Sequence, residues 1–138
     1  MRGTDGSGVR RLTQICRLVG TPGADTIAGT NSRDVIRGLG GNDHIDANPG
    51  DRIKPYYGIP DADDVDAGPG DDVVFGRRLA DNVRGGPGND RLVGGSGVDR
   101  LDGGPGNDTI EARDRTLDRI RCGSGDDRVV ADRLDVVA

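Results

Sequence analysis

The sequence predicts an all-β repeat protein in which a tight turn and then a short strand recur about every nine residues. From Gly20 onward, twelve successive units carry an aspartate at their sixth place. An aliphatic residue follows each aspartate by two places, and ten of these twelve residues are β-branched, which favours strands. Glycines precede most of the aspartates and favour tight turns. Each unit is therefore expected to be a turn followed by a strand.

The two columns run through the whole chain after residue 19. The sixth-place aspartates are Asp25, Asp34, Asp43, Asp63, Asp72, Asp81, Asp90, Asp99, Asp108, Asp118, Asp127 and Asp135. The aliphatic residues are Ile27, Ile36, Ile45, Val65, Val74, Val83, Leu92, Leu101, Ile110, Ile120, Val129 and Val137.

One unit carries a specific family resemblance. Residues 85–93 read Gly85-Gly86-Pro87-Gly88-Asn89-Asp90-Arg91-Leu92-Val93, and this stretch resembles the nonapeptide of RTX, or hemolysin-type calcium-binding, proteins. Residues 94–102 and 103–111 match the nonapeptide equally well, and the register covers residues 20–138. The resemblance implies a right-handed parallel β-roll, a β-solenoid of about six coils, with calcium bound in its turns.

The composition is unsuited to an ordinary globular core. The 138 residues allow one domain, but only 32% are hydrophobic and 2% aromatic, and 25 are glycine. The net charge is −5, and half of the 24 acidic residues are the sixth-place aspartates. Carboxylates and backbone carbonyls are the ligands that Ca²⁺ prefers. We therefore expect a calcium-free state that is largely unfolded and a compact calcium-bound state.

If each unit is half a coil, alternate turns stack on the same edge of the roll. The odd turns are residues 20–25, 38–43, 67–72, 85–90, 103–108 and 122–127, and all six keep glycine at the fourth place. The even turns are residues 29–34, 58–63, 76–81, 94–99, 113–118 and 131–135, and only 94–99 keeps the glycines. We therefore expect about five calcium ions, each bridging two stacked odd turns, and few or weak sites among the even turns.

The predicted metal ligands follow from this asymmetry. They are the carboxylates and turn carbonyls of Asp25, Gly23, Asp43, Gly41, Asp72, Gly70, Asp90, Gly88, Asp108, Gly106, Asp127, Gly125 and Asp99, with weaker candidates at Asp34, Asp63, Asp81 and Asp118. Arginines of the even turns are alternative partners that could neutralise the aspartates there: Arg33, Arg77, Arg78, Arg113, Arg115 and Arg133.

Two segments lie outside the regular register. Residues 1–19 form an N-terminal extension and a capping half-coil, in which Cys16 takes the aspartate column and Leu18 the aliphatic column. The β-roll itself covers residues 20–138, with an insertion loop at 47–57 that is either a tolerated surface insertion or a binding loop. The odd and even classes stay consistent only if this loop adds no half-coil.

The two cysteines are expected to be free thiols. Cys16 and Cys122 lie about six coils apart along the predicted stack, or roughly 25 to 30 Å at one strand spacing per coil. A disulfide needs Cα atoms within about 7 Å. Only an N-terminal segment folded back over the roll would bring the two residues together.

Outward positions of the two faces differ. The ninth places of the even units alternate in sign through Arg37, Asp66, Arg84, Asp102 and Arg121, which is the favourable cross-strand arrangement. The odd face is more apolar, with Val73, Phe75, Val93 and Val130. This odd face is a possible docking patch.

Several function classes find no support in the sequence. The single histidine, His44, excludes a multi-histidine metalloprotease site, and neither a nucleophile elbow nor a phosphate loop occurs, so we expect no enzyme activity. Arginines alternate with acids and only three aromatic residues occur, which argues against nucleic-acid binding. No stretch is long and apolar enough for a membrane span.

The function predicted first is a calcium-binding structural repeat module of a secreted protein. Residues 1–20 hold no apolar run typical of a signal peptide, so either export uses another route or the native start is missing. We expect a monomer, whose protein partner the sequence does not identify. The alternative is an adhesion or protein-interaction module that uses the 47–57 loop or the Phe75 face. An ice-binding solenoid ranks last, because the outward ranks mix Arg, Asp and Val.

Overall fold

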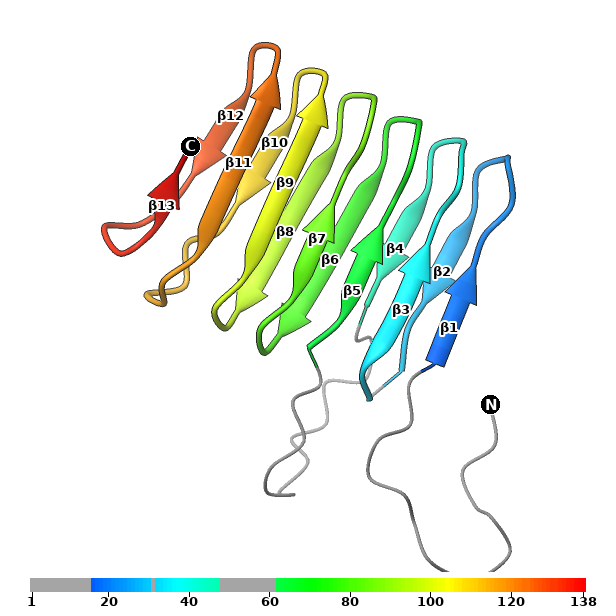
Figure 1. Cartoon of the computed structure of the whole chain (residues 1–138), viewed down its shortest axis with the longest axis horizontal. Helices are drawn as coiled ribbons and strands as arrows, with labels where there is room; N and C mark the ends of the chain where they lie inside the picture. Colours follow the sequence, from blue (N-terminus) through cyan, green and yellow to red (C-terminus); the bar gives the residue numbers. More distant parts are fainter. Residues whose placement is uncertain (1–15, 31, 48–61) are drawn as a thin grey trace, which may run out of the picture.

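The structure, a computed structural model, describes residues 16–30, 32–47 and 62–138. These residues form thirteen short strands in two parallel sheets and contain no helix (Figure 1). The predicted all-β parallel solenoid of about six coils is therefore confirmed. No helix in the described ranges is long and apolar enough to cross a membrane.

The strands fall into two sheets by parity of their number. The seven-stranded sheet holds β1 (Cys16–Val19), β3 (Asp34–Arg37), β5 (Asp64–Asp66), β7 (Asn82–Arg84), β9 (Arg100–Pro105), β11 (Arg119–Ser124) and β13 (Val136–Val137). The six-stranded sheet holds β2 (Thr26–Ala28), β4 (His44–Asp46), β6 (Val73–Arg78), β8 (Arg91–Ser96), β10 (Thr109–Glu111) and β12 (Arg128–Val130).

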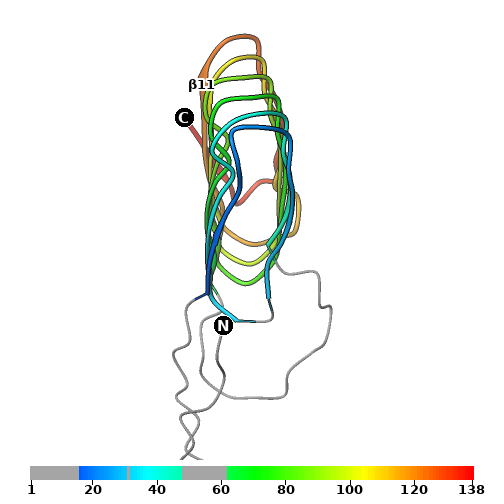
Figure 2. The same ribbon diagram turned by 90° about the vertical axis from the view of Figure 1, so that its right-hand side faces the viewer.

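Each strand pairs with the strand two positions away in the chain, so one nine-residue unit is half a coil. The end view shows the result as flattened coils stacked on one another (Figure 2). Strand β3 pairs with β5, and β4 pairs with β6, on either side of the insertion. The insertion therefore adds no half-coil, and the odd and even turns keep to opposite edges.

The aliphatic column forms the core. Its members from Ile36 to Ile120 are at most 2% exposed, and they face one another from the two sheets. At the ends of the stack the column opens: Leu18, Ile27 and Val129 are partly buried, and Val137 is 49% exposed. Among the described residues the core is therefore one large aliphatic side chain per half-coil, supplemented by the buried Ala47, Ala67 and Ala112.

The N-terminal half-coil pairs as the column pattern predicts. In β1, Cys16 lies opposite Asp34, and Leu18 lies opposite Ile36. Cys16 and Cys122 are both free thiols, in agreement with their expected separation along the stack. Residues 1–15 lie outside the described ranges, so the extension that precedes this half-coil stays a prediction.

Two alanines belong to the coils and not to the irregular segments. The backbone N–H groups of Ala47 and Ala112 donate to Phe75 and Val130 carbonyls at 2.9 and 2.8 Å, as first-place residues do elsewhere. Both alanines are almost fully buried. Ala47 is thus the first place of its unit, whereas the rest of the predicted loop, 48–57, lies outside the described residues. The tenth unit therefore begins at Ala112, and its turn, 112–118, is one residue longer than the regular six-residue turn.

The glycines of the odd turns are required by the close stacking of the coils. A side chain at Gly88 would place its Cβ 1.7 Å from the Gly70 carbonyl oxygen, and the residue has φ +141°. A side chain at Gly106 would likewise place its Cβ 1.7 Å from the Gly88 carbonyl oxygen. No L-residue side chain fits there without displacing the backbone of the neighbouring coil.

We expect Gly88→Ala to destabilise the folded protein by more than about 2 kcal/mol, because it adds both strain and a backbone clash. Gly40→Ala is the matched control. The nearest atoms to its Cβ are 3.6 and 3.7 Å away, and its φ lies outside the left-handed range. Denaturant unfolding in excess calcium measures both variants, and equal losses of stability would contradict the stacking argument.

Candidate metal centre

A ladder of carboxylates runs along each edge of the roll. The backbone N–H of each sixth-place aspartate from Asp25 to Asp118 donates to the Oδ1 atom of the sixth-place aspartate one coil later, at 2.7 to 3.0 Å. The ladder joins Asp25 to Asp127 on the odd edge and Asp34 to Asp135 on the even edge. One oxygen of each carboxylate thus holds two turns together.

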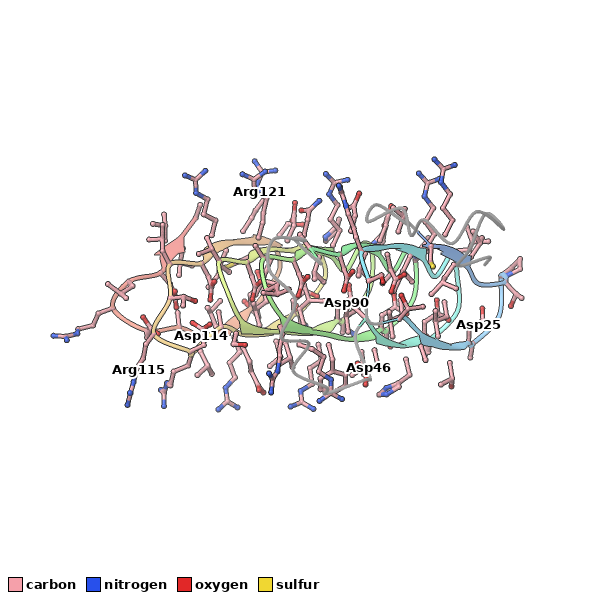
Figure 3. All side chains as sticks on the ribbon, turned by 90° about the horizontal axis from the view of Figure 1, so that it is seen from below. Asp25, Asp46, Asp90, Asp114, Arg115 and Arg121 are labelled. Atoms are coloured by element: carbon pink, nitrogen blue, oxygen red, sulfur yellow. The ribbon has the colours of Figure 1, made fainter. Side chains whose placement is uncertain are left out.

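The second oxygen has no such partner in the middle of the stack. The Oδ2 atoms of Asp43, Asp72, Asp81, Asp90, Asp99, Asp108 and Asp118 are buried without a hydrogen-bond partner. These side chains are at most 2% exposed, and Figure 3 shows Asp90 between the two sheets, while Asp46 and Arg121 lie on opposite outer faces. An uncompensated buried carboxylate oxygen is costly, so each one requires a cation or a proton.

These atoms fit a hard cation. Ca²⁺ takes six to eight oxygen ligands from carboxylates and backbone carbonyls. Gly70 and Gly88 direct their carbonyl oxygens toward the fourth-place glycine of the next coil, so carbonyls line the space between stacked turns. Among the described residues no three His, Cys, Asp or Glu side chains gather at one point. A cation between these turns would take backbone oxygens as well as carboxylates as ligands.

Burial raises the pKa of several sixth-place carboxyls, those of Asp72, Asp81, Asp90, Asp99, Asp108 and Asp118. Desolvation is the largest cause, and neighbouring aspartates of the column add to it, against the backbone hydrogen bond that lowers the pKa. The pKa of Asp81 rises to about 8 and that of Asp90 to about 7. Those of Asp99 and Asp118 rise to about 6. Without a cation, the turns therefore favour bound protons.

The even edge differs from the sequence prediction in one respect. Its arginines do not take up the carboxylates of Asp81, Asp99 and Asp118, whose Oδ2 atoms stay without a hydrogen bond. Arg77 instead makes an ion pair with Asp46, at 2.7 Å, on the outer face of the six-stranded sheet. Arg115 projects away from the roll (Figure 3). Carboxylate oxygens without a hydrogen bond thus occur on both edges, so they do not by themselves distinguish the odd edge from the even edge.

Backbone conformation separates the turns more sharply. The second and fourth places have φ between +99° and +145° in the odd turns 67–72, 85–90, 103–108 and 122–127, all with glycine there. The even turn 94–99 has the same form, with Gly95 at +100° and Gly97 at +134°. Turn 76–81 approaches it with Arg77 at +86° and Leu79 at +77°, which is strained for residues with a side chain. The sequence pattern did not predict these two residues in a glycine-like conformation.

A second ladder, which the sequence analysis missed, occurs on the odd edge at the fifth place. Asp71, Asn89, Asn107 and Asp126 each donate a backbone N–H to the side-chain oxygen of the fifth-place residue one coil earlier, at 2.8 to 3.0 Å, beginning with Asn42. A signal was present, because fifth places are Asn or Asp in these odd turns and Val98, Leu117 and Leu134 in later even turns.

Side chains close the turns at both ends of the stack. Asp25 and Asp34 accept the N–H of Thr21 and Thr30 on Oδ2 at 2.5 Å, so these two oxygens are already used.

On the even edge, Asp114 accepts the N–H of Gly97 from the preceding coil and of Thr116 from its own turn, both at 2.8 Å. Asp132 repeats the arrangement with Arg115 at 2.6 Å and Leu134 at 2.9 Å.

The fold and the turns define a class of protein, the metal-binding parallel β-solenoids, whose stacked turns present one buried carboxylate per half-coil. The family model of the RTX calcium-binding nonapeptide repeat matches residues 19–53, 57–78 and 75–110, with four copies. These ranges cover more than half of the chain, so the chain belongs to this family and is a calcium-binding repeat module. A comparison with curated proteins found no match.

The matched ranges end at residue 110, before the turns that Asp114 and Asp132 close. Where the sequence departs from the repeat pattern, aspartate side chains outside the sixth place thus accept backbone N–H groups of the turns. Turn 122–127 lies beyond the match too, yet it keeps the positive φ values at Gly123 and Gly125.

We expect the metal-free protein to gain strand content as the pH falls from 8 to 5. The carboxyls of Asp81, Asp90, Asp99 and Asp118 have folded-state pKa values of about 6 to 8, above the ordinary value of 3.8. Their folded form binds more protons than the unfolded form, so stability is lost as the pH rises through these values. Circular dichroism in EDTA measures the effect, and strand content that increased toward pH 8 would contradict it.

Asp114→Ala is expected to lower stability by about 1 kcal/mol in excess calcium, because two backbone N–H groups lose their acceptor. The number of bound calcium ions should stay unchanged, since Asp114 serves backbone groups. Chemical unfolding and calorimetry give the two readouts, and the loss of a bound ion in this variant would assign Asp114 to a metal site.

Proposed function

We propose that this chain is a calcium-dependent folding module of a secreted protein, unfolded in the calcium-poor interior of the cell and folded outside it. The observation that carries the proposal is the row of buried Oδ2 atoms without partners along both edges. A core of one aliphatic residue per half-coil leaves little free energy to offset their burial. Calcium supplies the missing partner, and extracellular modules bind it at about 10⁻⁴ to 10⁻³ M.

The geometry supports about five ions, distributed differently from the sequence prediction. Four lie between consecutive odd turns from 38–43 to 122–127, where Asp43, Asp72, Asp90 and Asp108 keep their Oδ2 atoms without a protein partner. The interval that begins at Asp25 is weaker, because Thr21 already donates to that carboxylate. The fifth lies on the even edge between turns 76–81 and 94–99, which share the odd-turn backbone form.

The remaining even intervals at the C-terminal end are disfavoured. Thr116 donates its hydroxyl to the Gly97 carbonyl at 2.5 Å, and Asp114 accepts the Gly97 N–H at 2.8 Å. Both backbone groups of Gly97 on that side are therefore committed to the next turn. The metal-binding part of the even edge is thus short.

We infer a structural and not an enzymatic role. His44 lies on the outer face with its ring 5.6 Å from that of Phe75, edge to face, and belongs to a surface cluster. The guanidinium groups of Arg77 and Arg91 lie 5.2 and 6.0 Å from the Phe75 ring centre. Phe75 is already packed among these side chains. This packing favours a role for Phe75 in stabilising the sheet over the docking role considered from the sequence.

We expect a calcium titration in EDTA-treated protein at neutral pH to produce cooperative strand formation with about five ions bound, whereas magnesium has little effect. Mg²⁺ demands a tighter octahedral shell and gives up its water reluctantly. Far-UV circular dichroism and calorimetry supply the two readouts. A chain that is fully strand-like in EDTA at pH 8 would overturn the coupling of calcium to folding.

Asp72→Asn and Asp71→Asn form a matched pair that tests the assignment of ligands. Both remove one negative charge from the same turn and keep the Oδ1 acceptor, but only Asp72 holds a buried Oδ2 without a partner. We expect Asp72→Asn to raise the calcium midpoint by at least about tenfold and to lower the ion count, because charged ligand number sets affinity. Asp71→Asn should behave as wild type, since asparagine already occupies this row in other coils.

A further inference from the structure

The seven-stranded sheet carries two outward rows with different charge patterns. The ninth-place row pairs Arg37 with Asp66, Asp66 with Arg84, Arg84 with Asp102 and Asp102 with Arg121, so charges alternate as the sequence predicts. Arg121 and Asp102 form an ion pair at 3.8 Å. Alternation of this kind stabilises neighbouring strands.

The seventh-place row of the same strands does not alternate. Arg100 on β9 and Arg119 on β11 are direct partners in the parallel register, and both are exposed. Asn82 lies on the other side of Arg100, and Val136 on the other side of Arg119. In the described part of the chain, neither arginine has an ion pair. Two like charges directly opposite each other cost stability, although the adjacent row shows that alternation is available on these strands.

Together the two rows make a basic surface on an acidic chain. Across β7, β9 and β11 the outward charged side chains are Arg84, Arg100, Arg119 and Arg121, with Asp102 as the single acid. The whole chain has a net charge of −5. Figure 3 shows Arg121 among the arginine side chains that project from this face of the roll. Strands β9 and β11 are hydrogen-bonded on both sides, so these guanidinium groups stand on a fixed framework.

We propose that Arg100 and Arg119, flanked by Arg84 and Arg121, form a binding surface for an anionic polysaccharide. Guanidinium groups bind sulfate and carboxylate groups bidentately, and neighbouring strands present them about 4.8 Å apart. A flexible chain with regularly spaced anionic groups can lie across the strands and neutralise the pair that the fold leaves opposed. This surface goes beyond calcium binding and requires only that the roll is folded.

Other anionic partners fit the surface less well. The aromatic rings of the described residues, Phe75 and His44, lie on the opposite sheet, so this face offers no platform for stacking bases. Interior strands of the sheet have no unpaired backbone for a peptide strand to join. The outward side chains at the seventh and ninth places of β7, β9 and β11 are Arg, Asp and Asn, and the exposed Val136 beside Arg119 lies on the edge strand β13, so the arginines stand among polar groups and not on an apolar lipid-binding face.

The test uses the full chain in excess calcium, with dextran sulfate as the probe and neutral dextran as the blank. We expect wild type to bind dextran sulfate with an affinity that falls as salt is added, and to ignore neutral dextran. Arg119→Glu should weaken binding by at least about tenfold, because it removes one guanidinium and places a repelling carboxylate in the surface. The same variant should raise the thermal midpoint by about 1 to 4 °C, since Arg100 gains an opposite charge as partner.

Arg37→Glu is the matched control on the same sheet. It changes the net charge equally but breaks an alternating pair with Asp66, so it should lower the thermal midpoint and leave binding unchanged. The proposal is overturned if wild type does not bind dextran sulfate, if both variants lose binding equally, or if a single-stranded oligonucleotide binds more tightly than dextran sulfate. A chain that stays unfolded in calcium would instead refute the calcium-dependent folding proposed above.

Discussion

The two oxygens of the sixth-place carboxylates in the middle of the stack have separate tasks, and the rest of the roll depends on both. Oδ1 accepts the backbone N–H of the turn one coil earlier, which fixes the spacing and register of consecutive turns. In Asp43, Asp72, Asp81, Asp90, Asp99, Asp108 and Asp118, Oδ2 is held inside the turn, away from water and without a protein donor. Removing the carboxylate would remove the hydrogen bond that joins two stacked turns. A charged carboxylate without a compensating partner, however, destabilises the same stack. The column thus makes the fold conditional on whatever compensates Oδ2.

That condition varies along the array. In the middle coils most of the sixth-place carboxylates have no partner for Oδ2, and glycines allow the neighbouring backbones to approach closely. Toward the ends, Thr21, Thr30, Asp114 and Asp132 supply donors and acceptors from the protein itself. Repeat arrays are stabilised by nearest-neighbour interfaces, and their terminal repeats often depart from the consensus for that reason. On our proposal, calcium acts on the central interfaces, while at the terminal ones side chains take up backbone groups of the turns.

Much of the fold could be predicted from the sequence, because the two columns repeat at a fixed spacing and each position has one physical role. Ile36 and Val65 had to face inward, and their pairing across the insertion followed once the parity of the coils was assumed. The boundaries of irregular segments could not be predicted in the same way. Ala47 and Ala112 replace glycine at a first place, so a pattern based on glycine placed Ala47 in the insertion and began the tenth turn at residue 113.

The metal centre was less predictable than the fold, because the sequence prediction inferred turn conformation from glycine content. Arg77 and Leu79 adopt positive φ without being glycine, so turn 76–81 stacks under Gly95 and Gly97 as an odd turn would. Their backbone strain is offset by packing against the coils on either side. A rule that considers one sequence position at a time cannot predict this. Asp114 likewise carries no mark in the repeat register, because its role depends on Gly97, seventeen residues earlier in the chain.

Charge on the outer faces is subject to weaker constraints than charge inside the turns, and this difference is informative. A buried carboxylate must be compensated, so its position follows from the fold. An exposed arginine can be replaced at little cost, and the alternating row of Arg84, Asp102 and Arg121 shows the arrangement that stability alone favours. The opposed pair Arg100 and Arg119 departs from it on the same two strands, where the fold imposes no such choice. A local departure from the stabilising pattern, on a rigid and exposed framework, is therefore better explained by a ligand outside the chain than by the needs of the roll.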